Sequence, residues 1–212
     1  MRELIERMDI DLLHLFNVRW GNPSLDQFWI AVSHLQQQFW FSYIVAPSLL
    51  MILFYIYGWR AFRPLIMTAV TVGIADAIAY RLIKVAIDRP RPFENPEIAG
   101  WLRHIGEAHG PSFPSNHATN CFAAAVILAW YFPEWVRLIY AFALLVAYSR
   151  IALGVHYPSD VLAGIILGYT VGTVVKMLLL NRIRALRIRK PVSKPETDSD
   201  DWRLRSRRLA DD

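Results

Sequence analysis

The sequence predicts an all-α fold, a polytopic membrane bundle of about five to six transmembrane helices preceded by short N-terminal interfacial helices. Of its 212 residues, 55% are apolar, and uncharged runs long enough to cross a bilayer recur along the chain. This length leaves no room for a second folded domain. We therefore expect one membrane domain over residues 1–180, followed by a basic, flexible cytoplasmic tail over residues 181–212.

The first 35 residues contain two short pieces of mixed polarity, residues 3–18 and 24–35, separated by a Gly-Asn-Pro turn. Neither piece is long enough to cross a bilayer. The first has apolar side chains at helical spacing beside acidic ones, which predicts an amphipathic helix lying in the membrane interface. It also lacks the apolar core and small-residue cleavage site of a signal peptide.

Five apolar segments follow, and each has the composition of a membrane helix. They comprise residues 39–57, 64–87, 116–132, 135–150 and 159–180. Glycine recurs every fourth residue in the last segment, which predicts that a neighbouring helix packs closely there. These glycines are Gly164, Gly168 and Gly172.

The second segment carries three ionisable residues, Asp76, Arg81 and Lys84. Charge is costly at membrane depth, so we expect these side chains to face the bundle interior or a watery end of the bundle. Structural pairing is the favoured interpretation for Asp76 and Arg81. The long polar loop at residues 88–115 that follows is of a kind that usually carries function.

Basic residues predict the orientation of the chain. Arg60, Arg63, Arg137 and the cluster at residues 182–190 mark cytoplasmic ends, which places the loop at 88–115 on the non-cytoplasmic side. Much of the basic charge follows a membrane helix and requires no nucleic-acid partner. The single Cys121 excludes an intramolecular disulfide.

Three polar blocks contain groups suited to phosphate chemistry: KVAIDRPRP at 84–92, PSNH at 114–117 and SRIALGVHYPSD at 149–160. The cations Lys84, Arg91 and Arg150 match phosphoryl oxygens. Ser115 is placed to cap the third apolar helix, whose first N–H groups would then face an anion.

Two histidines in these blocks offer the roles that phosphoryl transfer needs, attack on phosphorus and protonation of the leaving oxygen. Residue type alone does not decide which of His117 and His156 has which role. Pro158 suits the first turn of a helix, so we expect Asp160 to lie within reach of His156 and to fix its tautomer.

With the spacings K-x6-RP, PS-x-H and SR-x5-H-x3-D, the blocks resemble the type 2 phosphatidic acid phosphatase superfamily, the membrane relatives of vanadium haloperoxidases and bacterial acid phosphatases. The resemblance implies that His156 is a nucleophile forming a phosphohistidine, that Asp160 orients it, and that His117 is the general acid. It also implies a set of phosphate-binding residues: Lys84, Arg91, Ser115, Asn116 and Arg150. Asn116 stands where the family usually has glycine, but its backbone amide is still available.

We therefore expect a membrane lipid phosphatase without a cofactor, since the motifs offer no carboxylate cluster for Mg²⁺ and no ligand spacing for Zn²⁺. The favoured substrate is undecaprenyl diphosphate on the non-cytoplasmic face of the inner (plasma) membrane. Phosphatidylglycerophosphate, phosphatidate and lipid A phosphate are alternatives, as is transfer of the phosphoryl group to another lipid. Two other classes of protein are alternatives. One is a transporter or structural membrane protein whose charged residues only pair with one another. The other is a haloperoxidase that binds vanadate in the same pocket, which is the least favoured because those enzymes are soluble. The oligomeric state is not predicted.

Overall fold

The structure is a computed structural model that describes residues 2–35, 38, 39 and 41–189. The chain divides into two units, residues 1–176 and 177–212, and each is taken by itself. All regular secondary structure in the described ranges is helical, which confirms the predicted all-α class. Of the predicted tail, residues 181–189 are helical, and residues 190–212 lie outside the described residues.

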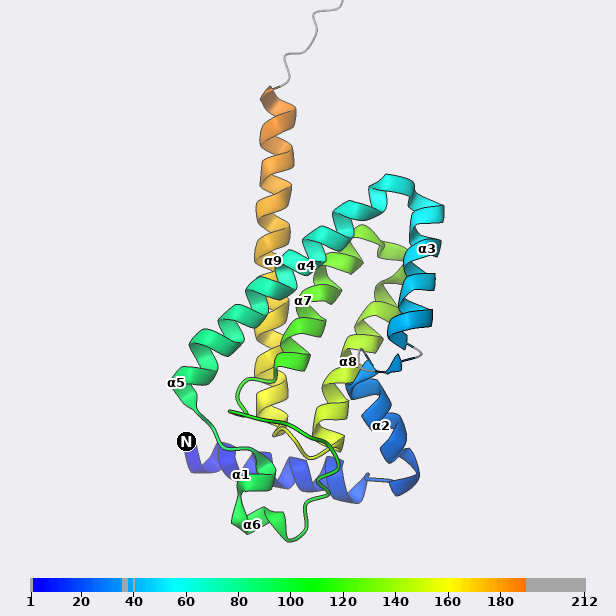
Figure 1. Cartoon of the computed structure of the whole chain (residues 1–212). Helices are drawn as coiled ribbons and strands as arrows, with labels where there is room; N and C mark the ends of the chain where they lie inside the picture. Colours follow the sequence, from blue (N-terminus) through cyan, green and yellow to red (C-terminus); the bar gives the residue numbers. More distant parts are fainter. Residues whose placement is uncertain (1, 36–37, 40, 190–212) are drawn as a thin grey trace, which may run out of the picture. The chain divides into compact units, whose positions relative to one another are not determined.

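The N-terminal helix α1 (Arg2–Leu13) continues into the π-helical turn η1 (His14–Arg19). Figure 1 shows α1 running across the ends of the other helices of the first unit. Its exposed side carries the apolar Leu4 and Met8, 62% and 53% exposed, together with charged residues such as Glu3 and Asp11. Asp9, Leu13 and Asn17 lie on the opposite, buried face. The helix is amphipathic as predicted, but its buried face carries two polar side chains.

A short second pair of helices follows, η2 (Pro23–Leu25) and α2 (Asp26–Ser33). The chain then forms η4 (Phe41–Val45) and α3 (Ala46–Tyr57), which ends at Gly58. Gly58 has a φ of 55°, a conformation that side chains with a Cβ rarely adopt. The turn η5 (Gly58–Ala61) leads into α4 (Phe62–Ala77), which continues through the π-helical η6 (Ile78–Lys84) into α5 (Val85–Ile87).

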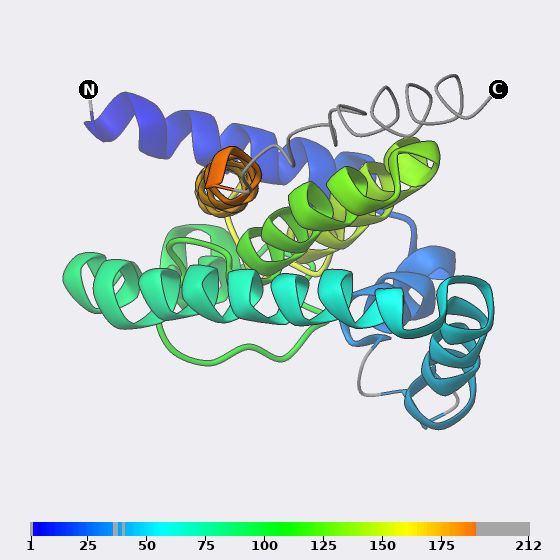
Figure 2. The ribbon, with the colours of Figure 1, turned by 90° about the horizontal axis from the view of Figure 1, so that it is seen from above.

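The second half of the chain forms three longer helices: α7 (Asn116–Tyr131), α8 (Val136–Ala152) and α9 (Pro158–Arg189), with the turn η8 (Pro133–Trp135) before α8. Figure 2 shows α7 and α8 between α4 on one side and α1 on the other. The buried apolar residues of α7 and α8 form the main core of the first unit.

The predicted glycine stripe of α9 packs against α7. A Cβ added at Gly164 would lie 2.6 Å from the Ser115 carbonyl oxygen, and one at Gly168 would lie 2.1 Å from that of Thr119. Both distances are far shorter than a van der Waals contact, so only glycine allows the two helices to approach this closely. The sequence-based expectation of close packing is confirmed.

By length and hydropathy, three segments of the described chain can cross a membrane: Phe41–Ala99, Pro133–Ala152 and Pro158–Asn181. The first contains both α3 and α4 with the turn between them. Helix α7, with 16 residues, is about 24 Å long at 1.5 Å per residue and is shorter than a typical span. The membrane helix bundle is confirmed, and the count of five to six spans stays a prediction.

The long loop at 88–115 contains two short helices, η7 (Pro92–Glu94) and α6 (Pro96–Ala99), where the sequence predicted only loop. The reason is local. Asn95 accepts a hydrogen bond from the Glu97 backbone N–H at 3.0 Å, and proline occupies the first position of each helix. The remainder of the loop is irregular and contacts the turn between α8 and α9.

Candidate functional site

His156 lies in the turn between α8 and α9 and is only 2% exposed. The turn passes through Gly154, whose φ is 71°, and a Cβ there would lie 2.6 Å from the Arg103 carbonyl oxygen. Helix α9 begins at Pro158, so Asp160 falls in its first turn as predicted. The His156 Nδ1 lies 3.6 Å from the Asp160 Oδ2.

The other ring nitrogen of His156 faces Arg91. The Arg91 Nη1 lies 3.3 Å from the His156 Nε2. Because a guanidinium can only donate, this contact requires a lone pair on Nε2 and therefore a hydrogen on Nδ1. Nδ1 in turn faces Asp160 and the Ser112 hydroxyl, whose oxygen is 3.4 Å away. The arrangement leaves Nε2 as the nitrogen able to attack an electrophile.

Burial lowers the pKa of His156 from 6.5 to about 4. The hydrogen bond and charge of Asp160 oppose this shift, and the positive charges of Arg91 and Arg150 add to it. At neutral pH the imidazole is therefore uncharged, which is the form that a nucleophile or a base requires.

The Asp160 carboxylate is fully buried and well supplied with donors. Its Oδ2 accepts hydrogen bonds from the Ser112 hydroxyl and from the Tyr157 N–H, the latter at 2.8 Å. Its Oδ1 accepts from the Arg89 Nη1 at 2.7 Å. These bonds hold the carboxylate in place beside His156.

Backbone carbonyls of the loop at 88–115 and of the turn between α8 and α9 hold two of the predicted phosphate-binding cations. Arg91 donates to the carbonyls of Gly110, Val155 and His109 at 2.8, 2.9 and 3.0 Å. Lys84, at the end of η6, donates to the carbonyl of Pro111, which Arg91 also contacts. Lys84 also interacts electrostatically with Arg91, Arg150 and Asp160.

Two buried groups at the centre lack hydrogen-bond partners within the part of the protein that the structure describes, the Ser115 Oγ and the Arg150 Nε. The Arg150 Nη1 donates to the Ser33 hydroxyl of α2. Ser115 does take the N-cap position of α7, but its hydroxyl makes no cap hydrogen bond, so the expected capping contact is wrong in that detail. The first N–H groups of α7 thus have no intrahelical acceptor and stay available to an anion.

The Asn116 side chain bonds to a residue of α4. Its Nδ2 donates to the Asp76 Oδ1 at 2.9 Å, and Asn120 donates to the same oxygen at 2.9 Å. The Asn116 side chain therefore faces α4, and only its backbone N–H is left for phosphate. Asp76 therefore has a structural role, as predicted, because it accepts hydrogen bonds from both asparagines. Arg81 is exposed, so of its two predicted locations the bundle interior is wrong. Its long side chain can reach a polar environment near a helix end.

His117 lies in the first turn of α7, on the same side of the fold as the cations. It interacts electrostatically with Arg150, His156 and Arg91. Its ring centroid lies 6.3 Å from that of His34 in an edge-on arrangement, so the end of α2 also borders the site. The structure thus brings both predicted histidines to one cationic centre.

The charge balance of this centre is unusual for buried groups. Lys84, Arg91 and Arg150 are 6%, 4% and 2% exposed, respectively. Within the described ranges, none of them forms an ion pair with a carboxylate. Burying like charges without a counter-ion is costly, so the centre is suited to an anion. The described residues contain no group of three or more potential metal ligands.

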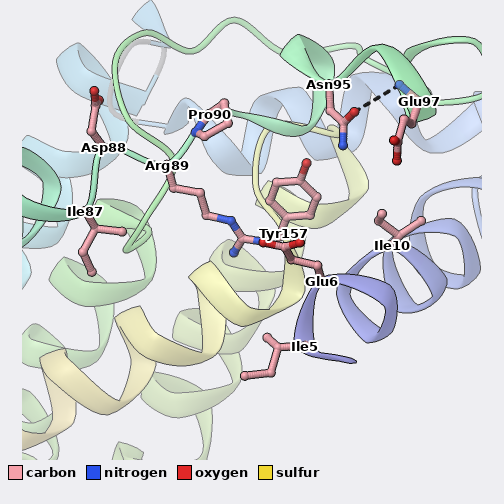
Figure 3. Close-up of a pocket in the computed structure, with 10 residues that line it drawn as sticks. All are labelled: Ile5, Glu6, Ile10, Ile87, Asp88, Arg89, Pro90, Asn95, Glu97 and Tyr157. Carbon is pink, nitrogen blue, oxygen red and sulfur yellow. Dashed lines mark hydrogen bonds between the residues drawn. The ribbon is translucent and has the colours of Figure 1, made fainter. Parts of the chain in front are cut away.

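A groove of about 860 Å³ borders this centre, but the residues that line it do not include the two histidines. Figure 3 shows it between α1, the start of the loop at 88–115 and Tyr157. The Arg89 guanidinium lies 4.1 Å from the centre of the Tyr157 ring. The groove therefore opens beside Arg89, which bonds to Asp160.

Four residues that contact the site were not singled out from the sequence: Asp9, Ser33, Arg89 and Ser112. Arg89 carried a detectable signal, because it is the first of two consecutive Arg-Pro pairs in the first block. The other three lie in segments without a distinctive pattern. Their roles depend on contacts between residues far apart in the sequence.

These features define a helical membrane protein with a buried cationic centre that contains two histidines. The PAP2 superfamily profile matches residues 64–184, which include all three polar blocks, and the chain belongs to this superfamily.

Several characterised proteins are similar to the chain. It is 30% identical over 129 residues to the undecaprenyl-diphosphatase BcrC of Bacillus subtilis, covering 61% of this chain and 65% of the relative. It is 45% identical over 114 residues to the decaprenylphosphoryl-5-phosphoribose phosphatase of Mycobacterium tuberculosis, covering 53% of this chain and 59% of the relative. The chain thus spans less than two thirds of the length of these two relatives.

A longer match is the lipid A 4'-phosphatase of Bacteroides thetaiotaomicron, 33% identical over 178 residues, which covers 79% of this chain and 75% of the relative. Among solved structures, LpxE of Aquifex aeolicus has a TM-score of 0.59 and 25% identity, covering 79% of this chain and 93% of that chain. The fold is therefore shared with a solved protein over most of its length.

Proposed function

We propose that this protein is an integral-membrane lipid phosphatase that works through a phosphohistidine. One observation carries the proposal: three buried cations without carboxylate partners in the described chain surround a neutral histidine whose Nε2 has a lone pair. A phosphate group supplies the missing negative charge and places phosphorus beside that nitrogen. The names of the relatives support the same class of activity, since those described above are phosphatases of lipid phosphates.

In the first step, Nε2 of His156 attacks phosphorus, forming a P–N bond while the P–O bond to the lipid breaks. Asp160 stabilises the positive charge that develops on the imidazole. Lys84, Arg91, Arg150, the Ser115 hydroxyl and the N–H groups of α7 bind the phosphoryl oxygens. His117 gives a proton to the leaving oxygen; burial and the neighbouring cations favour its neutral form, and the negative charge of bound phosphate favours the protonated form that this step needs.

In the second step, water attacks phosphorus and the P–N bond breaks. His117, now neutral, takes the proton of the attacking water, and inorganic phosphate leaves with His156 restored. The balance requires only water and the lipid phosphate, so we expect no cofactor. A transporter or structural protein whose charges only pair is disfavoured by the three cations that have no carboxylate partner in the described ranges.

The proposed substrate is undecaprenyl diphosphate. The likeness to BcrC supports it, while the likeness to the other two relatives keeps lipid A phosphate and other polyprenyl phosphates as alternatives. Phosphatidylglycerophosphate and phosphatidate complete the panel. Purified protein assayed against these lipids for released phosphate tests the proposal. Activity on none of them, with folded protein and added detergent, would contradict it.

The proposed location is the inner (plasma) membrane, with the active site on the non-cytoplasmic side. In a Cys121→Ser background, a cysteine replacing Glu107 in the long loop should react with an impermeant thiol reagent in intact spheroplasts. One replacing Ser199, which lies outside the described residues, should react only after lysis. The reverse pattern would place the active site in the cytoplasm.

A further inference from the structure

Arg89 differs from the other cations of the site because its guanidinium already pairs with two carboxylates and a hydroxyl. Its Nη1 donates to the Asp160 Oδ1 and the Ser159 hydroxyl, both at 2.7 Å. Its Nη2 donates to the Asp9 Oδ2 at 2.7 Å. Arg89 is therefore not placed to bind substrate phosphate, although it lies between Lys84 and Arg91 in the sequence.

Asp9 anchors this arrangement from helix α1. Its side chain is only 3% exposed, and it bonds both to Arg89 and to the first turn of α9. The Asp9 Oδ1 accepts from the Ser159 N–H at 2.8 Å, and the Oδ2 accepts from the Ser159 hydroxyl at 2.5 Å. Ser159 directly precedes Asp160, so α1 is bonded to the segment that carries the orienting carboxylate.

The contacts form a continuous chain from α1 to the imidazole of His156. Asp9 binds Arg89, Arg89 binds one oxygen of Asp160, and the other oxygen of Asp160 faces the His156 Nδ1. One planar guanidinium joins the two carboxylates, because Nη1 donates to Asp160 and Nη2 donates to Asp9, so the position of Asp9 sets the direction from which Arg89 reaches Asp160. Small displacements of a nucleophile are costly, since about 1 Å can lower a rate on the order of 100-fold.

We propose that Asp9 and Arg89 are positioning residues for phosphoryl transfer: Asp9 fixes Arg89, and Arg89 fixes Asp160 and, through it, His156. The interfacial helix α1 is then part of the catalytic apparatus. This inference rests on the proposed function, and its new content is the dependence of the chemistry on α1.

The test compares Asp9→Asn with Asp11→Asn. Both remove one negative charge from α1, but Asp11 is exposed, whereas Asp9 is buried against Arg89. Phosphate release is measured on full-length protein in detergent, with kcat expressed per folded molecule from thermal unfolding. We expect kcat to fall about 10-fold to 100-fold in Asp9→Asn with little change in KM, and to be unchanged in Asp11→Asn.

A double-mutant cycle shows whether Asp9 acts through Arg89. We expect Asp9→Asn to have no further effect on kcat in an Arg89→Met background, because the intermediate link is already lost. The acid limb of the pH–rate profile should move in both single variants, since the orientation of Asp160 influences protonation of His156. A structural role alone would lower the yield of folded protein and leave that limb in place.

The outcomes separate the two proposals. Activity of wild-type protein together with equal kcat values for Asp9→Asn and Asp11→Asn would overturn the inference alone. Additive effects of Asp9→Asn and Arg89→Met would do the same. If Arg89→Met yields no folded protein, Arg89→Lys takes its place, because it keeps the charge but loses the two-pronged geometry. A wild-type protein that releases no phosphate would overturn the proposed function and the inference with it.

Discussion

Two arginines near His156 differ in whether they have a carboxylate partner. Arg89 lies between two carboxylates, Asp9 and Asp160, each 2.7 Å away. Arg150 is 2% exposed, and its Nε has no hydrogen-bond partner in the described structure. The charge of Arg89 is therefore balanced by the protein itself, whereas that of Arg150 would be balanced by a bound anion.

The difference teaches that the same residue type has two separate tasks in this protein. A guanidinium that pairs with buried carboxylates stabilises the folded state, because its removal leaves those carboxylates unpaired. A buried guanidinium without a carboxylate partner reduces stability but favours binding, since the cost of its desolvation is compensated only when phosphate binds. Substitution of Arg89 should therefore mainly lower stability, whereas substitution of Arg150 should mainly lower activity.

The largest expected effect comes from the two histidines beside the cations that have no carboxylate partner. His156→Ala should abolish phosphate release, because no other group can form the covalent intermediate. His117→Ala should lower activity on a lipid phosphate by about 100-fold to 10,000-fold but should retain turnover of a substrate with an activated leaving group, which needs little protonation. Released phosphate, measured for both substrates, checks the division of roles. Near-normal activity of His156→Ala would show that the nucleophile is assigned wrongly.

The next largest effect distinguishes Arg150 from Arg89. Arg150→Met should lower kcat/KM by about 100-fold to 1,000-fold through loss of an oxyanion donor. Its unfolding temperature should stay equal or rise, since a buried cation without an ion pair is removed. Arg89→Met should instead lower the free energy of unfolding by about 3 kcal/mol, because Asp9 and Asp160 lose their shared partner. Thermal unfolding in detergent measures both, and a stability loss in Arg150→Met as large as that in Arg89→Met would refute the comparison.

A smaller effect concerns pH. Since the pKa of His156 is lowered to about 4, its neutral form persists as pH falls through 6.5, and activity limited by this group should decline only near pH 4. Arg91 contributes to the lowering, so Arg91→Met should raise this pKa and move the acid limb of the residual activity toward neutral pH. The pH–rate profiles of the wild-type protein and of Arg91→Met are measured on the same substrate. The protonation of the substrate then affects both profiles equally and does not change the difference between them. Identical acid limbs would show that Arg91 does not act on His156.

The smallest expected effect is that of chelators. EDTA should leave phosphate release unchanged, because the proposed steps use cations and N–H groups of the chain to bind the oxyanion. Vanadate should inhibit, since it has the charge and the oxygen arrangement of phosphate. Inhibition by vanadate should weaken in Arg150→Met but not in Asp11→Asn. Loss of activity in EDTA that Mg²⁺ restores would require a different mechanism.

Much of this protein is determined by local sequence. Apolar runs determine membrane helices wherever they occur, because lipid demands both apolar side chains and internal backbone hydrogen bonds. The spacing of His156 and Asp160 brings them together because four residues at the start of a helix span about one turn. The glycine repeat of α9 likewise predicts close packing, since its effect is a property of one helix face.

Only the tertiary structure decided which arginine of the first block binds a carboxylate and which faces the reacting nitrogen. Arg89 and Arg91 are two residues apart and each is followed by a proline. Their surroundings therefore differ only once the loop is folded. The same holds for Asp9, which lies among exposed acids of α1 yet bonds to a residue 150 positions away. Periodicity and propensity describe contacts within a few residues, and pairings across the whole chain depend on the packing of the helices that carry them.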